Sequence, residues 1–555
     1  MTYPHIVDLT DTPALRKERG AFFTPDAITR FIANWAIRSS EDSVLEPSTG
    51  DAAFLVAAVG RLLELAPEVA STPTVDGVEI YAESVRVAHH RVREAGGEAR
   101  IAHSDFFALE PNPIYDAVIG NPPYIRYQDF AGEARARSRA AALRGGVSLT
   151  GLASSWAAFT IHSAMCLKKG GRLGLVLPAE LLSVNYAAPV RKFLFSRFRD
   201  VQLVLFDEQV FPDAEADVVL LLADGYLEGP AEYATIRQSK DGSGLASLGQ
   251  GQTWTPTDVA AKWTTSLIDP EALATLRELQ HLGLFTSLEA WGDTTLGIVT
   301  GNNRYFTLSP ERVGELGLRG DELLCISPPG SSHLRGLTLS KAMLAKLGRE
   351  GRAIYLFYPT DPPSAEAAAY IRDGHRTGVD TAYKCRVRKT WYQVPLVRPA
   401  DLLLTCMNAD TPRLTTNEAG VRHLNSVHGV FLHEKWRELG RDLLPIASLN
   451  SVTLLHAEIV GRTYGGGILK IEPKEADLWT MPSPELIVAR ADALRSIKQE
   501  VSELLDQSML LDAVELVDRV IFNNCGHLSP SQIKQVRQAR ATIAQRRISR
   551  GTSGS

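Results

Sequence analysis

Apolar runs of strand length alternate with helical patterns from about residue 20 to about residue 225, and this alternation constrains the fold more than any other feature. Helix-like segments such as PDAITRFIANWAI and FLVAAVGRLLELA separate most of the runs. The runs are DSVLEP, VDGVEIYA, ARIAHSD, YDAVIGN, GRLGLVLP, VQLVLFD and DVVLLLAD. Strands that alternate with helices form parallel sheets with helices on both faces. The sequence therefore predicts a doubly wound, Rossmann-like α/β sheet.

The sequence changes in character after this region. The stretch SKDGSGLASLGQGQTWTPT is rich in Gly, Ser and Thr, which indicates a linker or a surface excursion. Residues 265–475 contain short segments with many turn residues, and residues 476–555 show helical periodicity. We therefore expect the α/β domain in residues 1–245, a mixed α/β domain in residues 265–475, and a helical C-terminal region in residues 476–555.

Composition excludes several classes of protein. The chain has 555 residues and 45% apolar residues, enough for more than one packed domain. No run approaches the roughly 18 apolar residues of a membrane span, and the first residues lack the pattern of a signal peptide. We expect a cytoplasmic monomer without membrane contact. The five cysteines have no paired spacing, so we expect no metal. A net charge of -5 argues against a uniformly basic nucleic-acid binder but permits a local basic face.

Polar residues follow three successive strands of the predicted sheet. In an open parallel sheet, ligands bind where strands end and helices begin. An acidic residue after the second strand suits a ribose diol, and a carboxylate beside an aromatic ring suits an adenine. Each acidic residue alone is explained by a helix N-cap or a solvated loop, but three in succession predict a cofactor that contains adenosine. The residues are Glu46, Ser48 and Gly50 after the first strand, Glu79 and Ile80 after the second, and Asp105 and Phe106 after the third.

The fourth strand, YDAVI, runs directly into GNPPYIRYQ. A surface turn could use Asn-Pro for its geometry alone. However, the order EPSTGDAAF, GVEI, SDFF, NPPY resembles that of the S-adenosylmethionine-dependent N6-adenine DNA methyltransferases of the gamma class, the TaqI-like enzymes. The upstream GAFFTPDAITRFI resembles that family's motif before the first strand. In the second half, GIVTGNNRYFTLSP, KTWYQVP and NSVHGVFL resemble segments of the TaqI-like specificity domain. The resemblance thus implies a catalytic domain followed by a target-recognition domain.

The resemblance implies S-adenosyl-L-methionine as the cofactor and assigns its contacts. Glu79 would bind the ribose hydroxyls, and Ile80 would lie against the adenine. Asp105 would accept from the cofactor's amino group, and Phe106 would pack on its ring. The residues that would line the methionine part are Thr24, Pro25, Glu46, Ser48 and Gly50.

The resemblance also implies the chemistry of Asn-Pro-Pro-Tyr. The adenine amine is a poor nucleophile, and two acceptors aimed at its N–H bonds would make it more tetrahedral and align it. The acceptors would be the side-chain oxygen of Asn121 and the carbonyl of Pro122, with Pro123 helping to fix the backbone. Tyr124 would stack on the base and stabilise the cationic transition state by about 1–2 kcal/mol.

The target adenine must leave the duplex to reach such a pocket. We expect Phe211 to form a second aromatic wall against the extruded base, although a core side chain is the alternative. Several arginines follow the tetrapeptide in what we interpret as a loop, which is either solvated and mobile or ordered by DNA phosphates. They are Arg126, Arg135, Arg137, Arg139 and Arg144.

A basic and aromatic strip lies in the second half, and it suits phosphates and base edges. An exposed strand without a binding role is the alternative, and generic pairings do not identify the bases that would be read. The strip comprises Lys384, Arg386, Arg388, Lys389, Trp391 and Tyr392.

Other functions share these motifs. Asn-Pro-Pro-Tyr also occurs in enzymes that methylate a glutamine side chain in a protein, and related tetrapeptides occur in ribosomal RNA methyltransferases. A non-catalytic DNA-binding subunit of a defence complex is a further alternative. The long second half favours double-stranded DNA. We find no nuclease pattern, so we expect either a solitary methyltransferase or the modification enzyme of a restriction-modification system with a separately encoded endonuclease.

Overall fold

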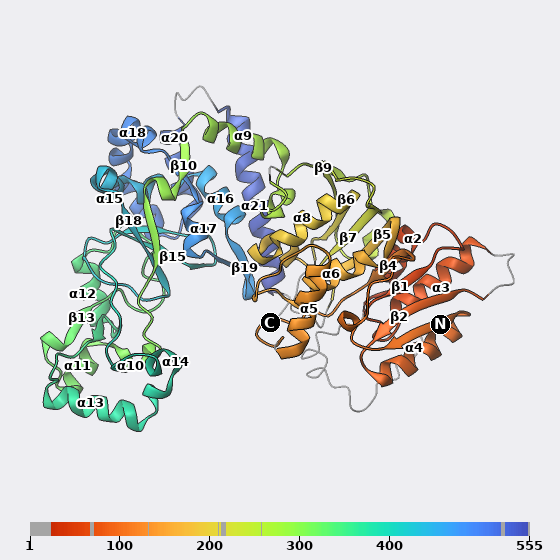
Figure 1. Ribbon diagram of the computed structural model, residues 1–555. Coiled ribbons are helices and arrows are strands. Elements are labelled where there is room, and N and C mark those ends of the chain that lie inside the picture. Colours follow the sequence, from red (N-terminus) through yellow and green to blue (C-terminus); the bar gives the residue numbers. More distant parts are fainter. Residues whose placement is uncertain are drawn as a thin grey trace. The chain divides into compact units, whose positions relative to one another are not determined.

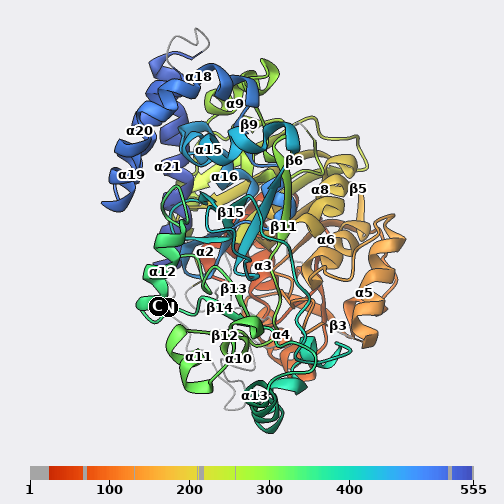
Figure 2. The same cartoon turned by 90° about the vertical axis from the view of Figure 1, so that its left-hand side faces the viewer.

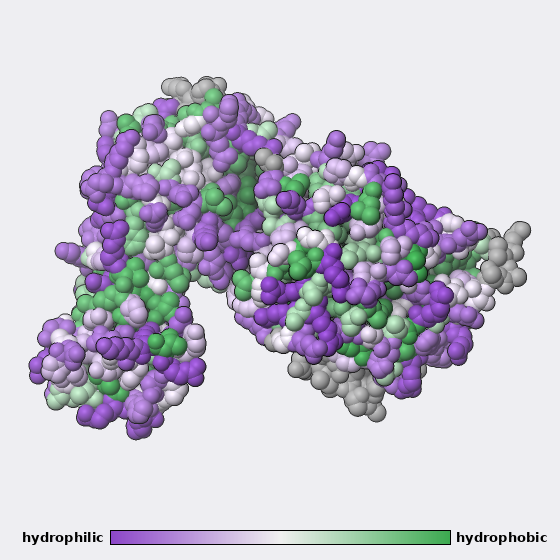
Figure 3. Space-filling model, viewed as in Figure 1, coloured by the Kyte–Doolittle hydropathy of each residue, from purple (hydrophilic) through white to green (hydrophobic). Residues whose placement is uncertain are grey.

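The computed structural model describes residues 24–66, 72–130, 132–208, 210–211, 218–256, 258–522 and 528–552. The chain forms two compact units, Met1–Leu267 and Ile268–Ser553 (Figure 1). The helical C-terminal residues, which we expected to form a region of their own, belong to the second unit. On the face shown in Figure 3, hydrophilic residues are interspersed with smaller apolar areas.

The first unit contains a nine-stranded sheet in the order β3-β2-β1-β4-β5-β7-β6-β8-β9. Neighbours from β3 to β5 are parallel, whereas β7 runs antiparallel to both β5 and β6. The seven apolar runs of the sequence correspond to β1 to β7, which confirms the predicted α/β fold. The strands are Val44–Glu46 (β1), Thr74–Glu79 (β2), Glu98–His103 (β3), Tyr115–Gly120 (β4), Leu167–Pro178 (β5), Phe198–Phe206 (β6), Val218–Tyr226 (β7), Ala234–Ser239 (β8) and Gln252–Trp254 (β9).

Helices cover both faces of this sheet (Figure 1). Successive strand residues point to opposite faces, so each central strand contributes to two cores. In β4, Val118 belongs to the core beneath α5, α6 and α8, and its neighbours Ala117 and Ile119 belong to the core beneath α2, α3 and α4. The helices are Asp26–Ala36 (α2), Ala53–Leu65 (α3), Ala82–Glu94 (α4), Gly132–Arg144 (α5), Ser155–Met165 (α6), Glu180–Ser183 (α7) and Ala188–Arg197 (α8).

Helix α2 shows how the local sequence sets an element that later bears on the site. Pro25 precedes it, and Asp26 in its first turn complements the helix dipole. Ile28, Ile32 and Ala36 recur every four residues and form its buried stripe. The start of the helix is thereby fixed. Thr24, which precedes Pro25, is held beside the sheet.

The stretch that we expected to be a linker or a surface excursion belongs to the first unit. It forms a short 3-10 helix, Gly242–Ser247, and the edge strand β9, which pairs antiparallel with β8. Trp254 of β9 is buried and packs edge to face on Trp263, with 5.8 Å between ring centroids. The Gly and Ser content reflects the turns within the stretch, and one tryptophan supplies the burial that attaches it.

The second unit contains four small sheets, in the orders β10-β21, β11-β18-β15-β17, β12-β14-β13 and β16-β20-β19. The strands of the first two are Phe285–Ser287 (β10), Thr480–Pro482 (β21), Gly292–Leu296 (β11), Val427–Leu432 (β18), Leu402–Thr405 (β15) and Leu414–Thr416 (β17). Those of the other two are Thr307–Leu308 (β12), Tyr355–Phe357 (β14), Leu323–Cys325 (β13), Met407–Asn408 (β16), Ile468–Lys470 (β20) and Arg462–Tyr464 (β19).

Helices α18, α19 and α20 pack together, and α21 packs on α16 and α9 (Figure 2). The helices of this unit are Pro270–His281 (α9), Asn303–Phe306 (α10), Pro310–Leu316 (α11), Lys341–Arg349 (α12), Ala365–Arg376 (α13), Tyr383–Arg386 (α14), Arg437–Ala447 (α15), Ser451–Val460 (α16), Pro473–Asp477 (α17), Pro484–Ser496 (α18), Lys498–Asp506 (α19), Leu510–Ile521 (α20) and Pro530–Thr552 (α21). In the described part of the chain no single helix is long and apolar enough to span a membrane, although α15 with Glu434–Trp436 before it and α16 after it pass that test as a bent pair.

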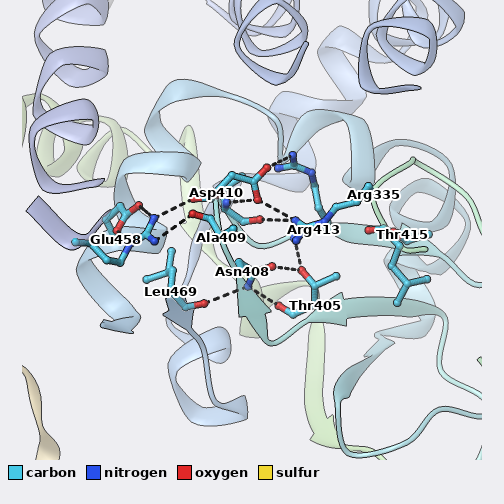
Figure 4. Close-up of polar contacts among 12 residues, drawn as sticks. Arg335, Thr405, Asn408, Ala409, Asp410, Arg413, Thr415, Glu458 and Leu469 are labelled. Carbon is cyan, nitrogen blue, oxygen red and sulfur yellow. Dashed lines mark hydrogen bonds and ion pairs between the residues drawn. The ribbon is translucent and has the colours of Figure 1, made fainter. Parts of the chain in front are cut away.

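Buried ion pairs attach α21 to the rest of the second unit. Arg547 pairs with Glu458 of α16 at 2.9 Å, and both side chains are 2% exposed. The same guanidinium donates to the carbonyls of Ala409 and Asp410 at 3.2 Å. Asp410 in turn accepts from Arg335 at 2.9 Å and from Arg413 at 2.7 Å (Figure 4). The C-terminal helix is therefore held by charge as well as by apolar packing.

Candidate active site

The polar residues after β1, β2 and β4 meet at one edge of the sheet. β1 is parallel to both neighbours, with Glu46 opposite Gly77 of β2 and Leu45 opposite Val118 of β4. The carboxyl ends of the three strands therefore point the same way. This is the edge at which doubly wound sheets bind ligands.

Glu79 joins the loop after β1 to the end of β2. Its carboxylate accepts from the N–H of Gly50 at 2.8 Å and from the N–H of Tyr81 at 2.9 Å. Gly50 has φ +52, a backbone conformation that favours glycine, and a Cβ built there would meet no atom within 4 Å. The turn beside Gly50 is thus tight and open to a ligand, and Glu79 holds it in place.

Glu46 lies deeper in the same site, with 2% of its side chain exposed. It accepts from the N–H of Leu55 at 3.2 Å. Burial, followed by the negative charge of Asp51, raises the pKa of Glu46 well above its usual range. A cation bound nearby would favour the ionised form of this carboxyl.

The Asn-Pro-Pro-Tyr segment follows β4 directly. The Asn121 amide nitrogen donates to the Thr24 hydroxyl at 3.1 Å, which fixes the orientation of the amide. The Tyr124 hydroxyl lies 2.6 Å from Oδ1 of Asn121 and 3.0 Å from the carbonyl of Val176. Burial raises the pKa of Tyr124, so this hydroxyl keeps its proton. Among the described residues no hydrogen-bond donor reaches the carbonyl of Pro122.

Asp105 follows β3 and caps a short 3-10 helix by accepting from the N–H of Phe107 at 3.0 Å. Its other oxygen pairs with Arg137 at 3.2 Å, and Arg137 also bonds Glu133 at 2.5 Å. The carboxylate thus lies at the expected strand end and already has two partners. A ligand amino group at Asp105 would compete with Arg137.

Comparison with known proteins places the chain in a family. Residues 83–211 match the model of the Eco57I restriction-modification methylase, and residues 260–522 match that of the C-terminal domain of the type II methyltransferase M.Eco57I. Type II methyltransferase M.AccI of Acinetobacter calcoaceticus is 23% identical over 91% of this chain and 93% of its own length. Type II methyltransferase M.XamI of Xanthomonas campestris pv. amaranthicola is 27% identical over 84% of this chain and 85% of its own. The chain belongs to the Eco57I family of DNA methyltransferases.

The resemblance seen in the sequence is consistent with this family, and the cofactor, S-adenosyl-L-methionine, is confirmed. A solved structure also shares the fold. The type IIL restriction-modification enzyme MmeI in complex with DNA aligns with a TM-score of 0.58 at 12% identity, over 94% of this chain and 74% of that one. The family models and the two type II relatives identify this chain as a type II DNA methyltransferase.

The described residues fit the cofactor. S-adenosylmethionine carries a sulfonium and an ammonium cation, and three carboxyl groups, those of Glu46, Asp51 and Glu79, lie near the ends of β1 and β2, with Asp51 paired to Arg91. Ile80 and Tyr81 are 55% and 44% exposed, which leaves apolar surface beside Glu79 for an adenine. Ser48 is half-buried in the same loop. The contacts that we predict for these residues, and for Thr24 and Pro25, remain predictions.

Two of the predicted aromatic contacts have buried rings. Phe106 is 5% exposed and lies between Phe159, stacked at 5.5 Å, and His162, at 4.6 Å edge to face. Phe211 is 4% exposed and belongs to the core cluster that includes Phe206. For Phe211, this packing favours the alternative of a core side chain over a wall against the base.

The arginine segment after the tetrapeptide is a helix, α5, and our interpretation of it as a loop is wrong. Arg135 donates to the carbonyls of Phe130 and Tyr127, and Arg144 bonds Glu110 at 3.1 Å. These side chains are thus held by the protein, as is Arg137. Arg126 and Arg139 are exposed and have no partner among the described residues, so they remain candidates for phosphate contacts.

The basic and aromatic strip of the second unit is also not a strand. It begins with the short helix α14. Some of its side chains point inward and contact the protein, and others point outward and are exposed. Arg388 donates to the carbonyls of Val299 and Thr300, both at 2.7 Å, and Trp391 packs on Tyr305 at 5.5 Å. These two half-buried side chains bind the protein itself, and the DNA contacts that we predict for them remain predictions. Lys384, Arg386 and Lys389 are exposed, and Tyr392 is half-buried against Trp391.

Sequence reasoning missed two contributors to the site. The carbonyl of Val176 accepts from Tyr124, and the hydroxyl and N–H of Thr49 both donate to the carbonyl of Val78 at 3.0 Å. A backbone carbonyl within an apolar strand has no sequence signal. Thr49 lies within the EPSTG motif and could have been identified there.

Proposed function

We propose that this Eco57I-family methyltransferase transfers a methyl group to the N6 amine of an adenine in double-stranded DNA. The observation that carries the proposal is the geometry of Asn121. Its amide nitrogen is bound by Thr24, so its oxygen is the atom turned toward Tyr124. An oxygen oriented in this way, beside the carbonyl of Pro122, to which no described residue donates, matches the two acceptors that an amine requires.

The two acceptors act on the geometry of the amine. The lone pair of a base amine is delocalised into the ring, and hydrogen bonds from both N–H groups stabilise the more tetrahedral, positively charged form. The cofactor, when bound, supplies an electrophilic methyl group. Asn121 and Pro122 then hold the amine in line with it, and no general base is needed before attack.

Tyr124 has two tasks in this proposal. Its hydroxyl proton can bond Asn121 or Val176 but not both at full strength, so entry of an amine at Asn121 shifts the bond to the Val176 carbonyl. Its ring is half-buried and can stack on a base extruded from the duplex. Stacking on an aromatic face stabilises the positive charge that develops on the amine.

The second unit is the proposed target-recognition domain. Its exposed Lys384, Arg386 and Lys389 supply cations for phosphates. MmeI, which shares this fold, was solved in complex with DNA, which supports DNA as the substrate. A cognate endonuclease would be encoded separately, and we expect a monomer. The catalytic first unit would then depend on the second unit for its choice of site.

The decisive experiment is incubation of the purified protein with labelled S-adenosylmethionine and DNA, followed by sequencing that detects N6-methyladenine. We expect label in the DNA and a single methylated motif. Label on a cytosine amine, on RNA or on a protein glutamine, with none on adenine, would contradict the proposal. Sequencing of the neighbouring genes would identify a restriction endonuclease.

A further inference from the structure

Ser155 is the first residue of α6, and it binds the catalytic segment on both sides of Tyr124. Its hydroxyl donates to the carbonyl of Pro123 and accepts from the N–H of Ile125 at 2.9 Å. Its own N–H donates to the carbonyl of Ile125 at 3.1 Å. Ser155 thus forms three hydrogen bonds with the two residues that flank Tyr124, two through its fully buried hydroxyl and one through its backbone N–H.

The start of α6 is itself anchored. The indole nitrogen of Trp156 donates to the Tyr186 hydroxyl at 3.1 Å, and that hydroxyl lies 3.0 Å from the hydroxyl of Ser154 and also bonds Glu180. Trp156 is completely buried. Ser155 therefore connects the catalytic segment to a rigid part of the first unit and not to a mobile loop.

We propose that Ser155 is a positioning residue that sets the place of the Tyr124 ring and the aim of the adjoining backbone. A hydroxyl can donate to Pro123 and accept from Ile125 at the same time, whereas alanine can do neither. Without the hydroxyl, only the bond from the Ser155 N–H to Ile125 remains. The backbone before Tyr124 is then free to shift, and small displacements of reacting groups strongly lower the rate. This inference rests on the proposed function of Asn121 and Tyr124.

The same helix offers a matched control. Ser163 is also completely buried in α6, and its hydroxyl has no hydrogen-bond partner among the described residues. Ser155→Ala and Ser163→Ala therefore remove the same atom from the same helix, and they differ in what that atom binds.

The test measures single-turnover methyl transfer at saturating cofactor and DNA, with the cofactor Kd and the melting temperature as separate readouts. We expect Ser155→Ala to lower the rate about 10- to 100-fold. We expect Ser163→Ala to stay within about 2-fold of the wild type, and both variants to keep the cofactor Kd within about 3-fold. Equal rates for the two variants would overturn the proposal, as would a loss of cofactor binding that matches the loss of rate.

Ser155→Cys distinguishes the loss of the hydrogen bonds from a folding defect. The thiol nearly preserves the volume but is a weak donor and a weak acceptor, so we expect normal melting and a rate at least about 10-fold below wild type. A folded Ser155→Cys with wild-type rate would overturn the proposal. Failure of the proposed function is distinguishable, because the wild type would then methylate a group other than adenine N6. The ratio of the two serine variants on that group would still test Ser155.

Discussion

The two units of this methyltransferase stabilise their key residues in different ways. At the edge of the first sheet, side chains hold backbone: Glu79 binds two N–H groups, and Ser155 binds Pro123 and Ile125. In the second unit, a buried ion pair joins two oppositely charged side chains, those of Arg547 and Glu458. Both kinds of contact join residues far apart in the sequence, but Glu79 lies within a recognisable motif, whereas Arg547 and Glu458 do not. This difference predicts which substitutions affect stability and which affect chemistry.

The largest effect on stability is expected in the second unit. Arg547→Met leaves the Glu458 carboxylate buried without its cation, and breaking a buried pair costs about 3–5 kcal/mol. Chemical denaturation should show this loss for the second unit, with cofactor binding by the first unit retained. The matched control is Arg519→Met, which removes an exposed pair with Glu515, and we expect it to cost less than about 1 kcal/mol. Equal effects would contradict the role of the buried pair.

The largest effect on chemistry is expected in the first unit. Asn121→Ala removes one of the two acceptors for the amine, and loss of one such group lowers kcat by about 100- to 1000-fold. Cofactor affinity and melting temperature should change little. Gln128→Ala, an exposed polar residue shortly after the same segment, is the control and should retain activity. Near-normal turnover of Asn121→Ala would refute the mechanism.

Glu46 predicts a pH dependence that is specific to the first unit. Its folded-state pKa is raised above 4.5, so its ionisation lowers the stability of the free protein as the pH rises from about 4.5 through that pKa. A cationic cofactor favours the ionised carboxyl, so its Kd should decrease over the same interval. Glu46→Gln should weaken cofactor binding at neutral pH and remove this pH dependence. Titration calorimetry at several pH values would measure both. An unchanged slope in Glu46→Gln would show that another group titrates.

The sequence predicted the first unit better than the second, for a physical reason. Strands buried on both faces, such as β4 and β7, are nearly continuous apolar runs, and all seven runs were recognisable, including that of the largely exposed edge strand β3. The strand β9 was missed because only Trp254 in a Gly-rich stretch is buried. Helix α5 was missed because its arginines bond local carbonyls and carboxylates, so it lacks a clear apolar stripe. Of the two features only α5 has a short-range signal, because its Ala, Arg and Glu residues favour a helix.

In the site, the order of motifs placed Glu79 and Asp105 at strand ends, where the structure has them. It could not show that Arg137 already binds Asp105, because α5 and the short 3-10 helix after β3 meet only in the folded chain. The same limit applies to Phe211, whose burial depends on the core around it. Composition likewise cannot separate inward from outward cations, as Arg388 and Lys384 demonstrate.

Arg388 and Lys384 give the prediction with the smallest expected effect, and it discriminates between inward and outward side chains. Lys384 is exposed on α14, and a phosphate contact there should contribute about one unit to the slope of log affinity against log salt. Lys384→Ala should lower that slope with unchanged stability. Arg388→Ala removes the bonds to Val299 and Thr300, so it should lower stability, while the salt slope stays near wild type. Fluorescence anisotropy with one DNA at several salt concentrations, together with thermal melting, measures both effects. If Arg388→Ala lowers the slope and Lys384→Ala does not, the division of the strip into inward and outward side chains is wrong for the DNA-bound protein, and the second unit must rearrange on binding.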